Sequence, residues 1–162
     1  GGDLVPGVPQ IVAFRAERSD ARTAEVEGVV TTADGDNVAR FASEHDPQGF
    51  HMDREAAAKG KFGCVIASGW HTCAMTMAML VENLKKNRQA GLGSPGLDEL
   101  RWLKPVYPGD TLRVESEIID VRPSRSRPEM GSTRAKVTVF NQKDEPVMSL
   151  ISIGLVATRP KE

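Results

Sequence analysis

Residues 67–86, which read ASGWHTCAMTMAMLVENLKK, give the clearest indication of the fold. The run through Val81 is mostly apolar, and Glu82, Lys85 and Lys86 then make it polar. Such a segment predicts one long helix that opens at Ser68 and whose first half is buried. Its apolar part is far shorter than the ~20 residues that cross a bilayer, so we expect it in the core of a globular domain.

The chain after this helix changes its pattern. Runs rich in β-branched residues follow the Gly/Pro loop of residues 91–96, and turn residues separate them. The predicted strands are 99–104, 111–121, 133–142 and 147–158. Because no helix lies between these strands, the sheet should be antiparallel. The sequence therefore predicts an α+β fold in which an antiparallel sheet wraps around a long central helix.

The residues before the helix predict two strands and two shorter helices. The strands are 10–14 and 24–30, and the helices are 34–46, capped by Asp34 or Asp36, and 53–59. The first helix should end near Asp46, because Pro47 disfavours helix in the residue before it. Asp46 is thus expected at a corner between a helix and a loop.

Composition limits the classes of function. At 162 residues the chain has the size of one domain, which we expect to span residues 1–162. Its 21 basic and 22 acidic residues leave no global charge to attract nucleic acid or an anionic membrane. Cys64 and Cys73 fit neither a disulfide framework nor a thiolate zinc site, and no apolar leader is recognised, so we expect a soluble, cytoplasmic protein.

The densest polar cluster is DPQGFHMD at residues 46–53. Asp46 and His51 lie five residues apart across a Pro/Gly loop and can converge on one point. Histidine titrates near neutrality, and a carboxylate beside it can orient a water, so the pair can move a proton. The alternative is that Asp46 caps a turn while His51 is an ordinary loop residue.

The start of the long helix is the second candidate feature. Free backbone N–H groups at a helix start suit a developing oxyanion, and Gly69 allows a ligand to approach closely. Plain capping by Ser68 is the alternative. Trp70 is a candidate for the wall of an acyl tunnel, whereas the methionines that follow are expected to fill the core. The histidines lack a metal-ligand spacing, so we predict no metal site.

Several of these runs together resemble the MaoC-like dehydratases, relatives of the (R)-specific enoyl-CoA hydratases. The runs are FASEHDPQGFHMD at 41–53, FGCVIASGWHT at 62–72, GSPGLDELRWLKPVYPGD at 93–110 and SRSRPEMGS at 124–132. The resemblance is strongest over residues 38–156. It implies a hotdog fold, in which Asp46 and His51 activate water and the Gly69 N–H polarises a thioester carbonyl.

This chain departs from the hydratase pattern at two places. The pattern is aspartate, any residue, Asn-Pro, any residue, histidine, and here Gln48 and Gly49 stand in place of Asn-Pro. A longer amide on a freer loop is expected to reshape the pocket. The residue before the oxyanion glycine, often histidine in the hydratases, is Ser68, which removes one polar group near the carbonyl.

The resemblance implies a lyase that reversibly hydrates a trans-2-enoyl-CoA to a 3-hydroxyacyl-CoA. No metal or redox cofactor is expected, and coenzyme A enters as part of the substrate. The residues expected to contact substrate are Gln48, Phe50, Ser68 and Trp70, with Arg125 and Arg127 as candidates for the phosphates.

Two other functions remain open, a hotdog thioesterase and a non-catalytic subunit that binds acyl thioesters. The two arginines have an alternative of their own, since an exposed basic hairpin is more often a solvated loop. A homodimer is expected, because one curved sheet leaves an open edge for a partner.

Overall fold

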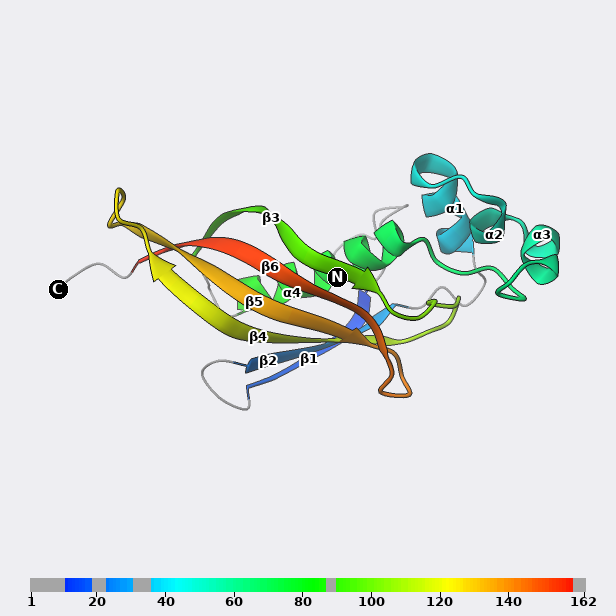
Figure 1. Ribbon diagram of the computed structural model, residues 1–162. Coiled ribbons are helices and arrows are strands. Elements are labelled where there is room, and N and C mark those ends of the chain that lie inside the picture. Colours follow the sequence, from blue (N-terminus) through cyan, green and yellow to red (C-terminus); the bar gives the residue numbers. More distant parts are fainter. Residues whose placement is uncertain (1–10, 19–22, 31–35, 87–89, 159–162) are drawn as a thin grey trace, which may run out of the picture.

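The computed structural model describes residues 11–18, 23–30, 36–86 and 90–158, and within them it forms one curved antiparallel sheet (Figure 1). The strand order is β1-β2-β4-β5-β6-β3. The strands are β1 (Ile11–Arg18), β2 (Thr23–Val30), β3 (Gly91–Trp102), β4 (Leu112–Pro123), β5 (Met130–Phe140) and β6 (Pro146–Ala157). The predicted antiparallel sheet is confirmed.

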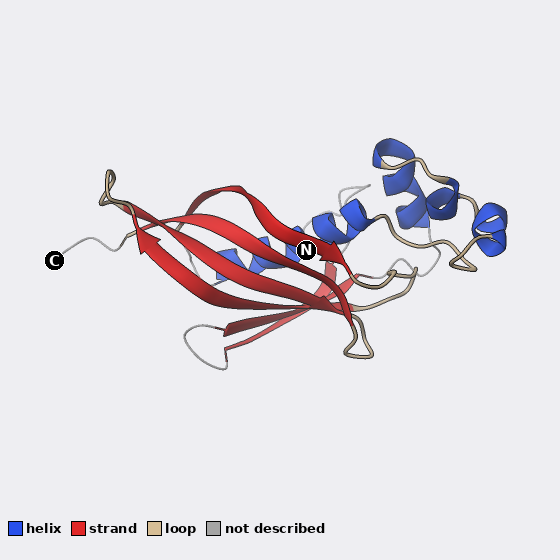
Figure 2. Cartoon of the chain, viewed as in Figure 1, coloured by secondary structure: helices blue, strands red, loops and turns tan. Residues whose placement is uncertain are grey.

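One long helix, α4 (Gly69–Lys86), runs along one face of this sheet, and three short helices gather at one end of it (Figure 2). The short helices are α1 (Asp36–His45), α2 (Gly49–Met52) and α3 (Arg54–Lys59). The hotdog arrangement implied by the resemblance is therefore confirmed. Among the described residues, no helix combines the length and the apolar character needed to cross a membrane.

The core lies between α4 and the central strands. Neighbouring strands are in register at Val114, Val139 and Met148, which form a buried row across β4, β5 and β6. Met75 and Met79 of α4 belong to the same buried cluster. Burying each such side chain contributes about 1.5–3 kcal/mol, so this row holds the helix on the sheet.

The two faces of α4 differ, and the prediction of a wholly buried first half is correct for only one of them. His71, Met75 and Met79 are buried, whereas Trp70 and Met77 are exposed. A helix lying on a single sheet covers only one side of itself, and residues seven apart return to the same side. The large apolar side chains of α4 that are exposed are Trp70, Met77 and Leu84.

The strand β3 begins earlier than the sequence predicts. Residues 91–96, expected as a loop, pair with β6 through an irregular register. Gly93 and Gly96 have positive φ angles of 131° and 159°, and shifts in the register fall beside them. Glycine tolerates such backbone, so a Gly/Pro run that looks like a loop can still pair as a bulged edge strand.

The helices before α4 begin and end largely as predicted. Asp53 caps α3, because its Oδ1 accepts hydrogen bonds from the N–H groups of Glu55 at 2.8 Å and Ala56 at 3.1 Å. The candidate cap Asp34 lies outside the described residues. The single turn α2 was not predicted, since four residues carry no periodic signal. His51 lies in this turn, and Asp46 directly follows α1.

Candidate active site

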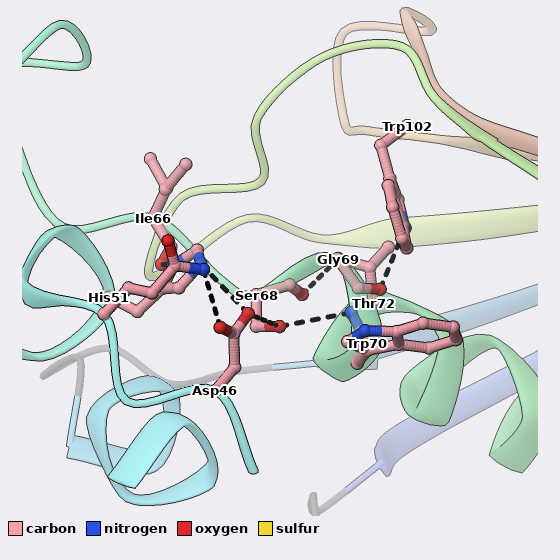
Figure 3. Close-up of polar contacts among 9 residues, drawn as sticks. Asp46, His51, Ile66, Ser68, Gly69, Trp70, Thr72 and Trp102 are labelled. Carbon is pink, nitrogen blue, oxygen red and sulfur yellow. Dashed lines mark hydrogen bonds and ion pairs between the residues drawn. The ribbon is translucent and has the colours of Figure 1, made fainter.

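Asp46 and His51 meet at the end of the sheet where the short helices gather (Figure 3). Asp46 leaves α1 with its N–H still bonded to the carbonyl of Ala42 at 2.8 Å, and Pro47 follows. His51 Nε2 lies 3.3 Å from Asp46 Oδ2. The side chains are 5% and 19% exposed for His51 and Asp46, so the pair is largely shielded but reachable.

The protonation of His51 follows from its other ring nitrogen. Nδ1 lies 2.8 Å from the carbonyl oxygen of Ile66. A carbonyl oxygen only accepts, so Nδ1 must carry the hydrogen of this bond. In the neutral ring, Nε2 then has a free lone pair, which faces Asp46. His51 is therefore held in the tautomer that can accept a proton at Nε2.

Both carboxylate oxygens of Asp46 have donors. Ser68 Oγ donates to Oδ2 at 2.6 Å, and Gln48 Nε2 donates to Oδ1 at 2.7 Å. These two hydrogen bonds, that of Ser68 above all, outweigh burial and hold the pKa of Asp46 below its ordinary range. Asp46 is a carboxylate at neutral pH. Gln48, which stands in place of the asparagine of the hydratase pattern, supplies an amide donor to it.

Together the two side chains can bind one water. The Asp46 carboxylate and His51 Nε2 are both acceptors, separated by 3.3 Å. A water that lies beside both atoms can donate one hydrogen to each, which leaves its oxygen lone pairs free to attack a substrate. The imidazole is then the group that can take up a proton, and the carboxylate stabilises the resulting positive charge.

The start of α4 lies beside this pair. Ser68 Oγ accepts from the Trp70 N–H at 3.2 Å, and the Ser68 carbonyl accepts from the Thr72 N–H at 3.0 Å. Ser68 therefore caps the helix and bonds Asp46 at once. The Gly69 N–H has no hydrogen-bond partner in the described part of the chain, which leaves it free to donate to an oxyanion.

Trp102 covers Gly69, a contact that the sequence did not predict. Its indole Nε1–H donates to the Gly69 carbonyl at 3.0 Å, and a β-carbon built on Gly69 would lie 2.4 Å from the indole ring. Trp70 meets the same ring edge-on, with centroids 5.4 Å apart. No local pattern links residues 69 and 102, because only the folded sheet brings the end of β3 to the start of α4.

A cavity of about 760 Å³ opens in front of these groups. Asp46, His51 and Gly69 line it, as do the predicted substrate contacts Gln48 and Trp70. Its other walls come from residues 61–62, 66–67, 72, 102–107 and 147, which include the cations Lys61 and Lys104.

The structure places the two other predicted substrate contacts behind the cavity wall. Phe50 packs on the core, with its ring centroid 4.4 Å from that of His51, and Ser68 is fully buried behind Asp46. Neither residue lines the cavity, and each contacts one member of the pair, so a direct contact with substrate stays a prediction.

Arg125 and Arg127 lie far from this cavity. They belong to the turn between β4 and β5, at the end of the sheet opposite the short helices (Figure 1). Both side chains are exposed. Neither arginine lines the cavity beside Asp46, and a contact with the phosphates stays a prediction.

A second buried histidine has no role in the pair. His71 stacks on Phe41, with ring centroids 4.5 Å apart, and its Nδ1 has no hydrogen-bond partner in the described part of the chain. Burial lowers the pKa of His71 to about 4. His71 is thus a neutral packing residue. The described residues contain no group of three or more His, Cys, Asp or Glu side chains able to hold a metal ion.

The chain is similar to known proteins in sequence and in fold. The uncharacterized protein YdeM of Bacillus subtilis (strain 168) is 36% identical over 112 residues, which are 69% of this chain and 77% of that protein. Mesaconyl-CoA hydratase of Cereibacter sphaeroides is 38% identical over 79 residues, 49% of this chain but only 22% of that protein. The crystal structure of the MaoC-like dehydratase from Rhodospirillum rubrum superposes with a TM-score of 0.68 at 37% identity, covering 81% of this chain and 87% of that one.

A family model described as MaoC like domain matches residues 15–140. The match begins within β1, so it includes N-terminal strands where the resemblance in sequence is weak. It also contains Asp46, His51 and Gly69. The chain therefore belongs to the MaoC-like domain family.

Proposed function

We propose that this protein is a hydratase that adds water to a trans-2-enoyl-CoA, giving a 3-hydroxyacyl-CoA, and that catalyses the reverse dehydration. One observation carries the proposal: Asp46 and His51 hold two acceptor atoms 3.3 Å apart on a cavity that Gly69 also lines. The similarity to a mesaconyl-CoA hydratase over 79 residues supports the same reaction class.

The proposed reaction moves one water and one proton. The water oxygen bonds to the β-carbon of the enoyl group while His51 Nε2 takes its proton. The electrons of the double bond move toward the thioester, and the Gly69 N–H stabilises the enolate oxygen. The proton on His51 then passes to the α-carbon, which restores the neutral ring. Asp46 orients the water and stabilises the transient imidazolium.

Product analysis separates this proposal from its two alternatives. A hydratase changes the ultraviolet absorbance of the enoyl group and releases no thiol. A thioesterase, which would aim the water at the carbonyl carbon, releases free coenzyme A. A binding subunit does neither. If the protein hydrates none of a panel of short, branched and long enoyl-CoA compounds, the hydratase proposal is refuted.

The proposed reaction needs no electron transfer, and coenzyme A takes part only as the carrier of the acyl group. His51 and the Gly69 N–H supply the base and the oxyanion donor. We therefore expect dialysis against a chelator to leave the hydration rate unchanged. A loss of rate that added metal restores would contradict this part of the proposal.

We also infer a homodimer. The strand β3 is an edge of the described sheet, and its outer backbone groups lack a neighbouring strand. Large apolar side chains are exposed beside this edge and on α4: Trp70, Met77, Leu84, Leu92, Leu97, Trp102 and Leu103. A second copy that pairs along β3 would cover both features. Light scattering at micromolar concentration should give twice the mass of one chain, and a strict monomer would contradict the inference.

A further inference from the structure

A continuous chain of hydrogen bonds connects the end of β3 to the carboxylate of Asp46 (Figure 3). The indole Nε1–H of Trp102 donates to the Gly69 carbonyl at 3.0 Å. The N–H of the same peptide group, which belongs to Trp70, donates to Ser68 Oγ at 3.2 Å. The Ser68 hydroxyl donates to Asp46 Oδ2 at 2.6 Å. Residues far apart in the sequence are thus joined by three bonds and one peptide group.

All the donors in this chain point toward the carboxylate. A bond accepted by the Gly69 carbonyl polarises its peptide group and makes the Trp70 N–H a stronger donor. A bond accepted by Ser68 Oγ likewise makes the hydroxyl proton more acidic. Ser68 is 0% exposed, so water does not compete for that proton. Each bond therefore strengthens the next, and the last one is the shortest.

We propose that Ser68 and Trp102 are positioning residues of this site, which hold the Asp46 carboxylate in one orientation as a pure hydrogen-bond acceptor beside His51. The inference rests on the hydratase activity proposed above and deepens it. Gln48 engages Oδ1 and Ser68 engages Oδ2, so both oxygens have protein donors before substrate enters. Proton transfer then passes through His51 alone.

Trp102 acts on the oxyanion donor as well. Its indole lies where a side chain on Gly69 would be, and it fixes the carbonyl of that residue. The same ring thereby sets the first turn of α4 and, through Ser68, the carboxylate. A single residue on β3 coordinates the two halves of the proposed site.

Few other charged or titratable groups face Asp46. His51 approaches from α2, and Lys61, Lys104 and Tyr107 line the same cavity from loops after α3 and β3. The first turn of α4 carries no acidic residue, and its one titratable ring, that of His71, is stacked on another helix. None of these groups is altered in the variants below, so a change in the titration of Asp46 reports the chain of hydrogen bonds.

The titration of Asp46 tests the proposal without any assay of activity. In protein labelled with carbon-13 at the aspartate carboxyls, the Asp46 resonance is the one missing from Asp46→Asn. Ser68→Ala removes the strongest hydrogen bond that stabilises the carboxylate, so the pKa of Asp46 should move upward. Trp102→Phe keeps a ring but loses the N–H, and it should move the pKa the same way by less.

A matched control removes a hydroxyl that is not in the chain. Thr76 is also buried in α4, at 2% exposure, and its Oγ1 donates to the Thr72 carbonyl at 2.8 Å. Thr76→Val should leave the Asp46 titration where it is in the wild type. Should Ser68→Ala fail to fold, Ser68→Cys keeps the shape with a weaker donor, and the same upward movement is expected.

Hydration kinetics supply the second readout. Ser68→Ala removes a hydrogen bond to a charged group, so we expect kcat to fall by about ten- to a hundredfold, with little change in KM. Trp102→Phe should lose roughly threefold. An unchanged Asp46 titration in folded Ser68→Ala overturns the proposal, and movement in Ser68→Ala without any in Trp102→Phe overturns the part played by Trp102. Wild-type protein without hydratase activity defeats the proposed function, yet the titration still decides the hydrogen-bond chain.

Discussion

Two histidines are buried in different places, His51 beside the cavity and His71 between α1 and α4. These two side chains differ in their hydrogen-bond partners. His51 has Ile66 O on one ring nitrogen and Asp46 on the other, whereas Nδ1 of His71 has neither a donor nor an acceptor among the described residues. Their side chains are about equally buried, at 4% and 2% exposure as whole residues. Burial alone therefore does not distinguish a reactive histidine. The fixed tautomer and the neighbouring carboxylate do.

The largest expected effect is a loss of hydration rate when His51 or its partner Asp46 is replaced. His51→Ala and Asp46→Asn should each lower the hydration rate by about a hundredfold or more, the scale of a positioned acid or base. The rates are measured with an enoyl-CoA substrate, and thermal melts of each variant show whether the fold is retained. A folded variant of either kind with near-normal rates would remove the distinction between the two histidines.

A similar loss is expected at the oxyanion donor. Gly69→Val places a side chain where the Trp102 indole lies and displaces that ring from the first turn of α4, which carries the proposed N–H donor, so turnover should fall by about a hundredfold. Trp102 is 49% exposed and can move aside, which lets the fold survive. Gly91→Ala, whose β-carbon meets nothing within 4 Å, is the control. Full activity in folded Gly69→Val would exclude Gly69 as the donor.

The other histidine should affect stability and its dependence on pH. Burial lowers the pKa of His71 to about 4. Between pH 6.5 and about 4, His71 is therefore protonated in the unfolded chain and neutral in the folded chain. Folding stability is therefore lost as the pH falls through this window, by about 3 kcal/mol at most. His71→Phe removes the titrating group and should flatten urea-denaturation stability across that range, with hydration at pH 7 within about threefold of wild type. An equally steep pH dependence in the variant would show that other groups cause it.

The smallest effect is expected at the opposite end of the sheet. Arg125 and Arg127 are exposed on the β4–β5 turn, so replacing both with alanine should change kcat and KM by less than about twofold. Raising the salt concentration should not alter this result. A clear rise in KM for the coenzyme A substrate would instead identify these arginines as phosphate contacts.

Much of the fold could be predicted from local signals. Pro47 ends α1 beside Asp46, Asp53 caps α3, and the apolar run after Ser68 forms α4. These features depend on residues within a few positions of one another. The early start of β3 could not be predicted, because its Gly/Pro run becomes a strand only through the pairing with β6.

The same limit applies to the site. Asp46 and His51 share one loop, so their convergence could be expected from the sequence. The bond from His51 to Ile66 O and that from Trp102 to the Gly69 carbonyl join segments 15 and 33 residues apart. Ser68 could be recognised as a cap, but its bond to Asp46 spans 22 residues and depends on how α1 meets α4. Long-range contacts of this kind give the site its partners.

The central claim is that Asp46 and His51 act as a unit on one water, and a double-mutant cycle tests it most directly. The hydration rate is measured for wild type, Asp46→Asn, His51→Ala and the double variant, with melts to confirm that all four are folded. Groups that share one proton-transfer step are strongly non-additive. The account predicts that the double variant is little slower than the slower single variant. Losses that multiply in the double variant would contradict it.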